Sequence, residues 1–213
     1  MAGPSASRII MLATASLLLA GCAGEATAPA AATHASQLRT SPFVPNASQR
    51  ALVGVADGVY AVTFDPRHDQ SFSLGPNHLD IPANSVCDLA SSGYGADYWN
   101  QSCAPERGPV TISVTIRNSQ SDTPEIDFQP AMRFNPTKSV ELYIYAEHAT
   151  QADASVLVMN YCNDLGACVD ESLQDSDLQT YVDSRANVVF RRVKHFSGYV
   201  VAERSSYDSF MDY

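Results

Sequence analysis

Hydrophobic and polar residues alternate with a period of two through the middle of the chain. In residues 110–117, Val and Ile occupy every even position and polar residues lie between them. The same alternation recurs in residues 126–134 and 140–147. This period is typical of β-strands with one buried face and one solvent-facing face. Shorter segments with strand character are 59–64, 79–81, 155–161, 187–194 and 199–203.

These segments predict an all-β domain. Clusters of Gly and Pro separate several of them, as expected of turns between strands. Pro130 falls inside one alternating segment, which predicts an edge position or a bulge there because proline cannot donate a ladder hydrogen bond. About eight short strands at this spacing predict an antiparallel β-sandwich. A helical turn is expected within residues 171–181.

The first residues have the features of an export signal. Arg8 precedes an apolar run over residues 9–20, which is shorter than the roughly 20 residues of a membrane-spanning helix. The run ends in Leu-Ala-Gly-Cys, which resembles the lipobox cut by the bacterial lipoprotein signal peptidase. We therefore expect residues 1–21 to be removed and Cys22 to carry the lipid that holds the protein at a membrane. The alternative is an ordinary cleaved signal followed by an incidental cysteine.

The signal predicts a location in the cell envelope. Ala23 follows Cys22, and in a Gram-negative host this resembles the pattern that directs lipoproteins to the outer membrane. Residues 22–50 are rich in Ala, Thr, Ser and Pro and predict a disordered linker. Residues 51–204 are long enough to form one domain with its own core. Residues 205–213 form a polar tail.

Charge excludes some classes of partner. Without residues 1–21 the chain keeps 12 basic residues against 23 acidic residues, a net charge of −11. A nucleic-acid-binding protein needs a basic face, so no nucleic acid is expected as a partner. The acidic residues that crowd 164–177 lack the spacing of a calcium loop and predict a solvated loop. No cofactor motif and no paired histidine spacing occur, so we expect neither cofactor nor metal.

Four cysteines besides Cys22 predict two disulfide bonds in an exported protein. Three connectivities are possible. We favour the local pairs, Cys87 with Cys103 and Cys162 with Cys168, because each closes a loop between strand-like segments. The alternative is a four-thiolate metal site, but these spacings lack the close Cys-x-x-Cys pairs of zinc sites.

Aromatic side chains suggest a binding surface. Tyr143 and Tyr145 alternate with core-facing positions and are therefore expected on the outer face of their strand. Tyr98 and Trp99 lie within the loop that Cys87 and Cys103 would close. Exposed rings on a rigid frame can bind an envelope protein or a glycan. The alternative is that a second sheet or a loop covers them.

Three segments in order resemble the ZU-type domain, the β-sandwich found in zonula-occludens proteins, ankyrins and netrin receptors. They are Leu-Asp-Ile-Pro-Ala-Asn-Ser-Val at 79–86, Met-Arg-Phe-Asn-Pro at 132–136 and Val-Lys-His-Phe-Ser-Gly-Tyr at 193–199. The resemblance covers about residues 70–203 and implies a β-sandwich. The four cysteines and the lipid anchor are not part of the family pattern, so the partners of its intracellular members do not carry over.

In some members of that family a His-Phe-Ser sequence cuts itself between Phe and Ser. The resemblance implies the same cut between Phe196 and Ser197, with the Ser197 hydroxyl attacking the Phe196 carbonyl and His195 as general base. The plainer alternative is structural. A strand would end near His195, Phe196 would fill the core, and Ser197 and Gly198 would turn or bulge into a last strand led by Tyr199.

Three functions are therefore open. We favour a membrane-anchored lipoprotein whose β-sandwich is a non-enzymatic binding module for an unknown envelope protein or glycan. The alternative is a self-processing domain that cleaves once between Phe196 and Ser197. A third possibility is a hydrolase, which would need carboxylates with perturbed pKa values gathered in a deep pocket.

Overall fold

The computed structural model describes residues 57–151 and 154–204. The chain divides into two units, residues 1–38 and 39–213, and every described residue belongs to the second. The predicted signal, Cys22, the whole linker and the polar tail lie outside the described residues. No helix within the described part is long and apolar enough to span a bilayer.

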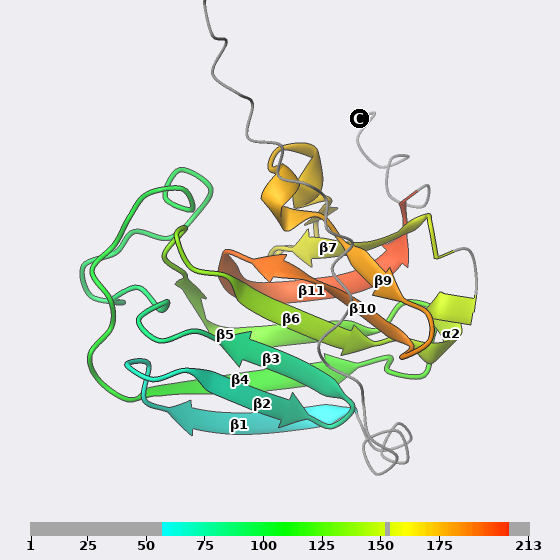
Figure 1. The fold of residues 1–213 in the computed structure, drawn as a ribbon, viewed down its shortest axis with the longest axis horizontal. Coiled ribbons are helices and arrows are strands. Elements are labelled where there is room, and N and C mark those ends of the chain that lie inside the picture. Colours follow the sequence, from blue (N-terminus) through cyan, green and yellow to red (C-terminus); the bar gives the residue numbers. More distant parts are fainter. Residues whose placement is uncertain (1–56, 152–153, 205–213) are drawn as a thin grey trace, which may run out of the picture. The chain divides into compact units, whose positions relative to one another are not determined.

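Within the described residues, eleven strands form two antiparallel sheets, which lie one in front of the other in Figure 1. The six-stranded sheet has the order β1-β4-β5-β11-β7-β8, and the five-stranded sheet has the order β2-β3-β6-β10-β9. The strands of the first sheet are β1 (Gly58–Phe64), β4 (Val110–Arg117), β5 (Glu125–Arg133), β7 (Leu157–Cys162), β8 (Cys168–Val169) and β11 (His195–Glu203). Those of the second are β2 (Gln70–Leu74), β3 (Asn77–Ile81), β6 (Val140–Tyr145), β9 (Tyr181–Asp183) and β10 (Val188–Val193). The predicted β-sandwich is confirmed.

The core lies between the two sheets and is built from the alternating residues. Ile112 of β4 and Ile126 of β5 face Leu142 of β6 within one apolar cluster, and all three are fully buried. Burying such side chains contributes about 1.5–3 kcal/mol each. The period of two therefore identifies the core-facing positions of these strands correctly.

Three strands were not predicted: β2, β8 and β9. The predicted helical region contains two 3₁₀ helices, η2 (Glu171–Leu173) and η3 (Ser176–Leu178), and a short helix, α2 (Glu147–Gln151), follows β6. Pro130 does not lie at an edge, because β5 is flanked by β4 and β11. It lies where the β5–β11 register shifts, in the interval between the pairs Phe196↔Met132 and Gly198↔Asp127. The bulge alternative is therefore correct.

The chain crosses from one sheet to the other at Lys194. This residue alone separates β10, in the five-stranded sheet, from β11, in the six-stranded sheet. The strand break thus falls just before His195, and residues from His195 onward form one strand rather than a separate strand led by Tyr199. As a result, His195 lies at a corner of the sandwich, where groups from both sheets can reach it.

The outer face of β6 is covered. Tyr143 and Tyr145 point away from the core, as expected, but they are only 0% and 3% exposed and belong to a second apolar cluster with Val188 and Phe190. Tyr143 and Phe190 stack with ring centroids 5.2 Å apart. These two tyrosines are therefore not an exposed binding surface.

Both local cysteine pairs are disulfide-bonded. Cys87–Cys103 closes a long loop between β3 and β4, and Cys162–Cys168 closes the β7–β8 hairpin. The described residues contain no group of three His, Cys, Asp or Glu placed to hold a metal ion.

Candidate functional site

The imidazole of His195 lies between a hydroxyl and a carboxylate. Its Nδ1 is 3.0 Å from Ser197 Oγ and its Nε2 is 3.0 Å from Glu171 Oε1. His195 comes from the start of β11, and Glu171 comes from η2, 24 residues earlier. All three residues are buried, with exposed fractions of 0%, 3% and 6% for His195, Ser197 and Glu171. The structure therefore assembles a chain of hydroxyl, imidazole and carboxylate away from solvent.

Arg191 holds the carboxylate end of this chain. It points inward from β10, and its guanidinium forms an ion pair with Glu171 Oε2. It also donates to the Met159 carbonyl at 2.7 Å and lies 5.6 Å from the centre of the Tyr199 ring. Burial alone would raise the pKa of Glu171, but the His195 hydrogen bond and the Arg191 charge outweigh it and hold the pKa below its ordinary value. Glu171 is thus a carboxylate at neutral pH.

The charge on Glu171 fixes the tautomer of His195. A carboxylate only accepts hydrogen bonds, so the ring nitrogen that faces it, Nε2, carries the proton. Burial lowers the pKa of His195, and although Glu171 opposes this effect the pKa stays below its ordinary value. The imidazole is therefore neutral, and Nδ1 presents a lone pair to Ser197. The Ser197 hydroxyl consequently donates to Nδ1.

Tyr94 hydrogen-bonds the carbonyl that precedes Ser197. Its hydroxyl donates to the Phe196 carbonyl oxygen at 2.9 Å, although the two residues are 102 positions apart. Burial raises the pKa of Tyr94 to about 12, so the phenol keeps its proton at neutral pH; a side-chain hydrogen bond with Ser197 acts in the opposite direction on the pKa. A donor at this position polarises the carbonyl and makes its carbon more electrophilic.

Aromatic rings enclose the imidazole. Trp99 stacks on His195 with centroids 4.0 Å apart, and Tyr161 meets it edge-on at 4.6 Å. The hydroxyl of Tyr199, four residues further along β11, donates to the His195 carbonyl at 2.6 Å. On the core side, Phe196 stacks on Phe128 at 4.4 Å. These contacts leave His195 little freedom to rotate away from Ser197.

The peptide bond between Phe196 and Ser197 lies at an interruption of the sheet. The β5 register shifts between Phe196 and Gly198, and pairing with β7 begins at Gly198. Ser197 therefore falls between paired residues, as expected of a bulge. A bulge re-aims the side chain that it contains, and here the Ser197 side chain is directed to His195.

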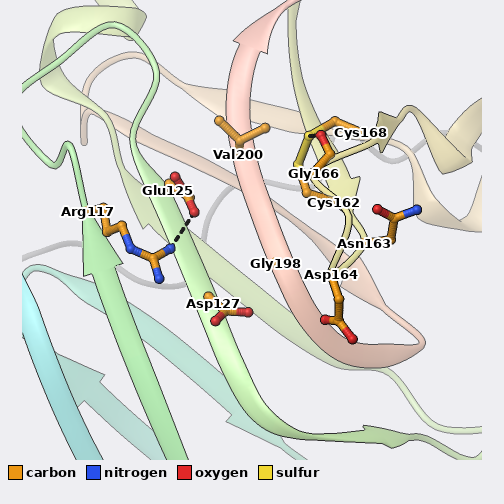
Figure 2. A pocket seen from close by; sticks show the side chains of 10 residues that line it. All are labelled: Arg117, Glu125, Asp127, Cys162, Asn163, Asp164, Gly166, Cys168, Gly198 and Val200. Atoms are coloured by element: carbon orange, nitrogen blue, oxygen red, sulfur yellow. Dashed lines mark hydrogen bonds and ion pairs between the residues drawn. A yellow bond between two sulfur atoms is a disulfide. The ribbon is translucent and has the colours of Figure 1, made fainter.

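A polar hollow lies beside β11, next to Gly198 and Val200. It has a volume of about 420 Å³, and Figure 2 shows its lining side chains from β4, β5, β11 and the β7–β8 hairpin. Arg117 and Glu125 form an ion pair there at 2.6 Å. Burial raises the pKa of Asp127, the neighbouring carboxylates of Glu125 and Asp164 add to this effect, and Arg117 opposes it. The hollow brings carboxylates together on the sheet surface. Gly198, which follows Ser197 in the chain, lines it, but His195, Ser197 and Glu171 do not.

The structure places the residues proposed from sequence in different surroundings. His195, Phe196 and Ser197 come together with partners that had not been identified: Glu171, Arg191 and Tyr94. Glu171 had been expected in a solvated acidic loop, which is wrong because it is buried and paired. Trp99 packs against His195, whereas Tyr98 remains 41% exposed. Cys22 lies outside the described residues.

One signal in the sequence could have indicated a buried ion pair. Arg191 alternates with Val189 and Val193, so it occupies a core-facing position of its strand and requires an acidic partner. Comparisons with protein-family models, with curated proteins and with solved structures gave no match. The functional argument therefore depends on the geometry of this site.

Proposed function

We propose that this β-sandwich cleaves its own chain once, between Phe196 and Ser197. The observation that carries the proposal is the position of Ser197 Oγ, which donates to a neutral, buried His195 while the adjacent Phe196 carbonyl accepts a hydrogen bond from Tyr94. Nucleophile, base and electrophile activation thus converge on one peptide bond.

The first step is an N-to-O acyl shift. Ser197 Oγ attacks the Phe196 carbonyl carbon, and its proton passes to His195 Nδ1. The oxygen of the resulting tetrahedral species carries negative charge, which the Tyr94 hydroxyl stabilises. The bond between the Phe196 carbon and the Ser197 nitrogen then breaks, and the nitrogen takes the proton from His195. The product is an ester between Phe196 and the Ser197 side chain, with a free Ser197 amine.

The second step is hydrolysis of this ester. Water attacks the ester carbonyl and gives a proton to His195, which returns it to Ser197 Oγ as the carbon–oxygen bond breaks. Phe196 ends as a carboxylate, and its acid proton passes to the free Ser197 amine, which becomes the new N-terminal ammonium. One water molecule is consumed, and no cofactor is needed for either step.

Burial explains why the reaction would occur once and within the chain. With Ser197 only 3% exposed and His195 covered by Trp99, an external substrate has no route to the pair. The scissile bond is instead already adjacent to its nucleophile, which replaces a bimolecular encounter by a positioned intramolecular one.

The envelope location remains part of the proposal and is supported by sequence alone. The signal over residues 1–21 and the lipobox cysteine Cys22 support an exported, membrane-anchored lipoprotein. A binding role, which the sequence favoured, has support in the exposed ring of Tyr98. The contacts of His195 and Ser197 favour self-cleavage as the main function.

Intact mass of the purified chain tests self-cleavage. We expect two pieces that divide between Phe196 and Ser197, and an N-terminal sequence that begins at Ser197. Ser197→Ala should stay whole, because it lacks the nucleophile. Ser113→Ala, a partly buried serine on β4, should cleave like the wild type. A wild-type chain that keeps a single mass after folding would refute the proposal.

A further inference from the structure

We propose that the Cys87–Cys103 disulfide is a redox gate for the cleavage, so that the site becomes competent only after this bond forms. The inference rests on the proposed self-cleavage and concerns its regulation. It is carried by the position of two site residues, Tyr94 and Trp99, within the loop that this disulfide closes. The carbonyl donor and the ring stacked on the base thus both depend on one loop.

This loop has little structure of its own. Between β3 and β4 the described chain forms no helix or named strand. Its local hydrogen bonds close short turns; for example, the Tyr98 N–H donates to the Gly95 carbonyl at 2.9 Å. Apart from the contacts that Tyr94 and Trp99 make at the site, side chains of the sandwich hydrogen-bond the loop. Arg133 of β5 donates to three loop carbonyls, those of Gly93, Tyr98 and Gln101. Lys194 also hydrogen-bonds the Asn100 side chain.

The disulfide joins the two ends of the loop at the sheet. Cys87 is 1% exposed and its N–H donates to the Arg133 carbonyl at 3.0 Å. Cys87 is bonded to Cys103, and its backbone bridges Pro105. Closing a loop of this length removes conformations that the open loop would otherwise sample, with an effect of about 10²-fold on the population of the closed form. Without the bond, Tyr94 and Trp99 are held by their own contacts with the Phe196 carbonyl and the His195 ring, and by the hydrogen bonds of the loop to Arg133 and Lys194.

The second disulfide provides a matched comparison. Cys162–Cys168 closes the β7–β8 hairpin, and β7 lies beside β11. Its intervening residues, 163–167, make no hydrogen bond or ring contact with His195, Phe196 or Ser197 in the described structure. Opening this hairpin removes a cross-link but none of the groups that act on the scissile bond.

The gating step is a thiol–disulfide exchange. The thiols of Cys87 and Cys103 are oxidised to a disulfide while a low-molecular-weight disulfide, such as oxidised glutathione, is reduced to two thiols. No peptide bond changes in this step. An exported chain would therefore stay whole while its thiols are reduced and would cleave after it reaches an oxidising compartment.

Cell-free synthesis of the full chain tests the gate. The chain carries Cys22→Ser so that no fifth thiol takes part, and it is made in reductant before oxidised glutathione is added. We expect intact chain in reductant and cleavage after oxidation. The double variant Cys87→Ser/Cys103→Ser should cleave about 10²-fold more slowly than the oxidised parent. Cys162→Ser/Cys168→Ser should cleave within a few-fold of it.

Trp99 reports loop position independently of cleavage, because it is the single tryptophan of the chain. In an uncleavable Ser197→Ala background, loss of the Cys87–Cys103 bond should move Trp99 emission to longer wavelength while far-UV circular dichroism keeps the β signature. Loss of that signature would mean global unfolding and would overturn the gate as a local device.

The remaining outcomes separate the two proposals. Equal cleavage in reductant and in oxidant would overturn the gate and leave self-cleavage standing. Equal slowing by both double variants would also overturn it, because the effect would then be general stabilisation. A parent chain that is folded, oxidised and intact would refute self-cleavage itself.

Discussion

Replacing Tyr94 by Phe removes one hydroxyl and keeps the ring in the loop. The hydroxyl donates to the Phe196 carbonyl oxygen at 2.9 Å. In the folded precursor this is a hydrogen bond between neutral groups, whose net contribution to stability is about 1 kcal/mol. During the acyl shift the same oxygen becomes an anion, and the bond strengthens. The substitution should therefore affect the rate more than the stability.

The size of the rate effect follows from the surroundings of Tyr94. Removing one donor from an oxyanion site slows a reaction by about 10²–10³-fold. Tyr94 is 40% exposed as a residue, so water can partly replace the lost donor. We expect the lower end of that range, about 10²-fold, which corresponds to about 2.7 kcal/mol in the barrier.

The rate is measured by following intact chain with time after cell-free synthesis in oxidising buffer. Urea unfolding of Tyr94→Phe in an uncleavable Ser197→Ala background gives the stability separately. Tyr98→Phe is the matched control, because Tyr98 lies in the same loop and is exposed to a similar extent. Cleavage of Tyr94→Phe at the wild-type rate would refute the role of Tyr94 in activating the carbonyl.

Two further predictions concern the base. Glu171→Gln lets an amide N–H face Nε2 and favours the wrong tautomer, so cleavage should slow by at least about 10²-fold; loss of the buried charge pair should also cost about 3–5 kcal/mol in urea unfolding. Glu125→Gln is the control, because Glu125 forms a solvent-exposed ion pair with Arg117, and it should change the free energy of unfolding by at most about 1 kcal/mol. Equal destabilisation by Glu171→Gln and Glu125→Gln would contradict the buried role of Glu171. The cleavage rate should fall on acidification as His195 takes up a proton, with a midpoint below the ordinary histidine pKa of about 6.5 because burial lowers the pKa. The folded state should lose stability as the pH falls from about 6.5 to that midpoint, since the unfolded chain binds the proton more readily in this range. A midpoint above 6.5 in the pH–rate profile would contradict a buried neutral base.

The sequence predicts the strands that alternate strongly and misses those that do not. Residues 110–117 show four apolar positions at a strict period of two, and they form β4. In β2 only Phe72 and Leu74 are large and apolar, among Ser and Gln, so the pattern is weak. β8 and β9 have two and three residues, too few for any period to appear.

The site could be predicted only where its residues are adjacent in sequence. His195, Phe196 and Ser197 form a contiguous motif, so a resemblance could reveal them. Glu171 and Tyr94 reach the same bond from distant segments, through η2 and a disulfide-closed loop. Their roles depend on the fold, because an acidic residue in an acidic run gives no local sign that it is buried. Sequence therefore indicates the proposed nucleophile and base but not the groups that would position and assist them.

The place of β11 inside its sheet has a mechanical consequence. Its residues 198–203 pair with β7, and 198–200 also pair with β5, while Tyr199 and Val201 are fully buried. After cleavage the part of this strand from Ser197 onward would be a separate peptide kept in place by its neighbours. A force that pulls the C-terminal end of this peptide along the strand direction would load its hydrogen bonds to β5 and β7 in shear. These hydrogen bonds would then resist the force together. The cut chain would thus resist gentle loads and part under strong ones, leaving an open slot between β5 and β7.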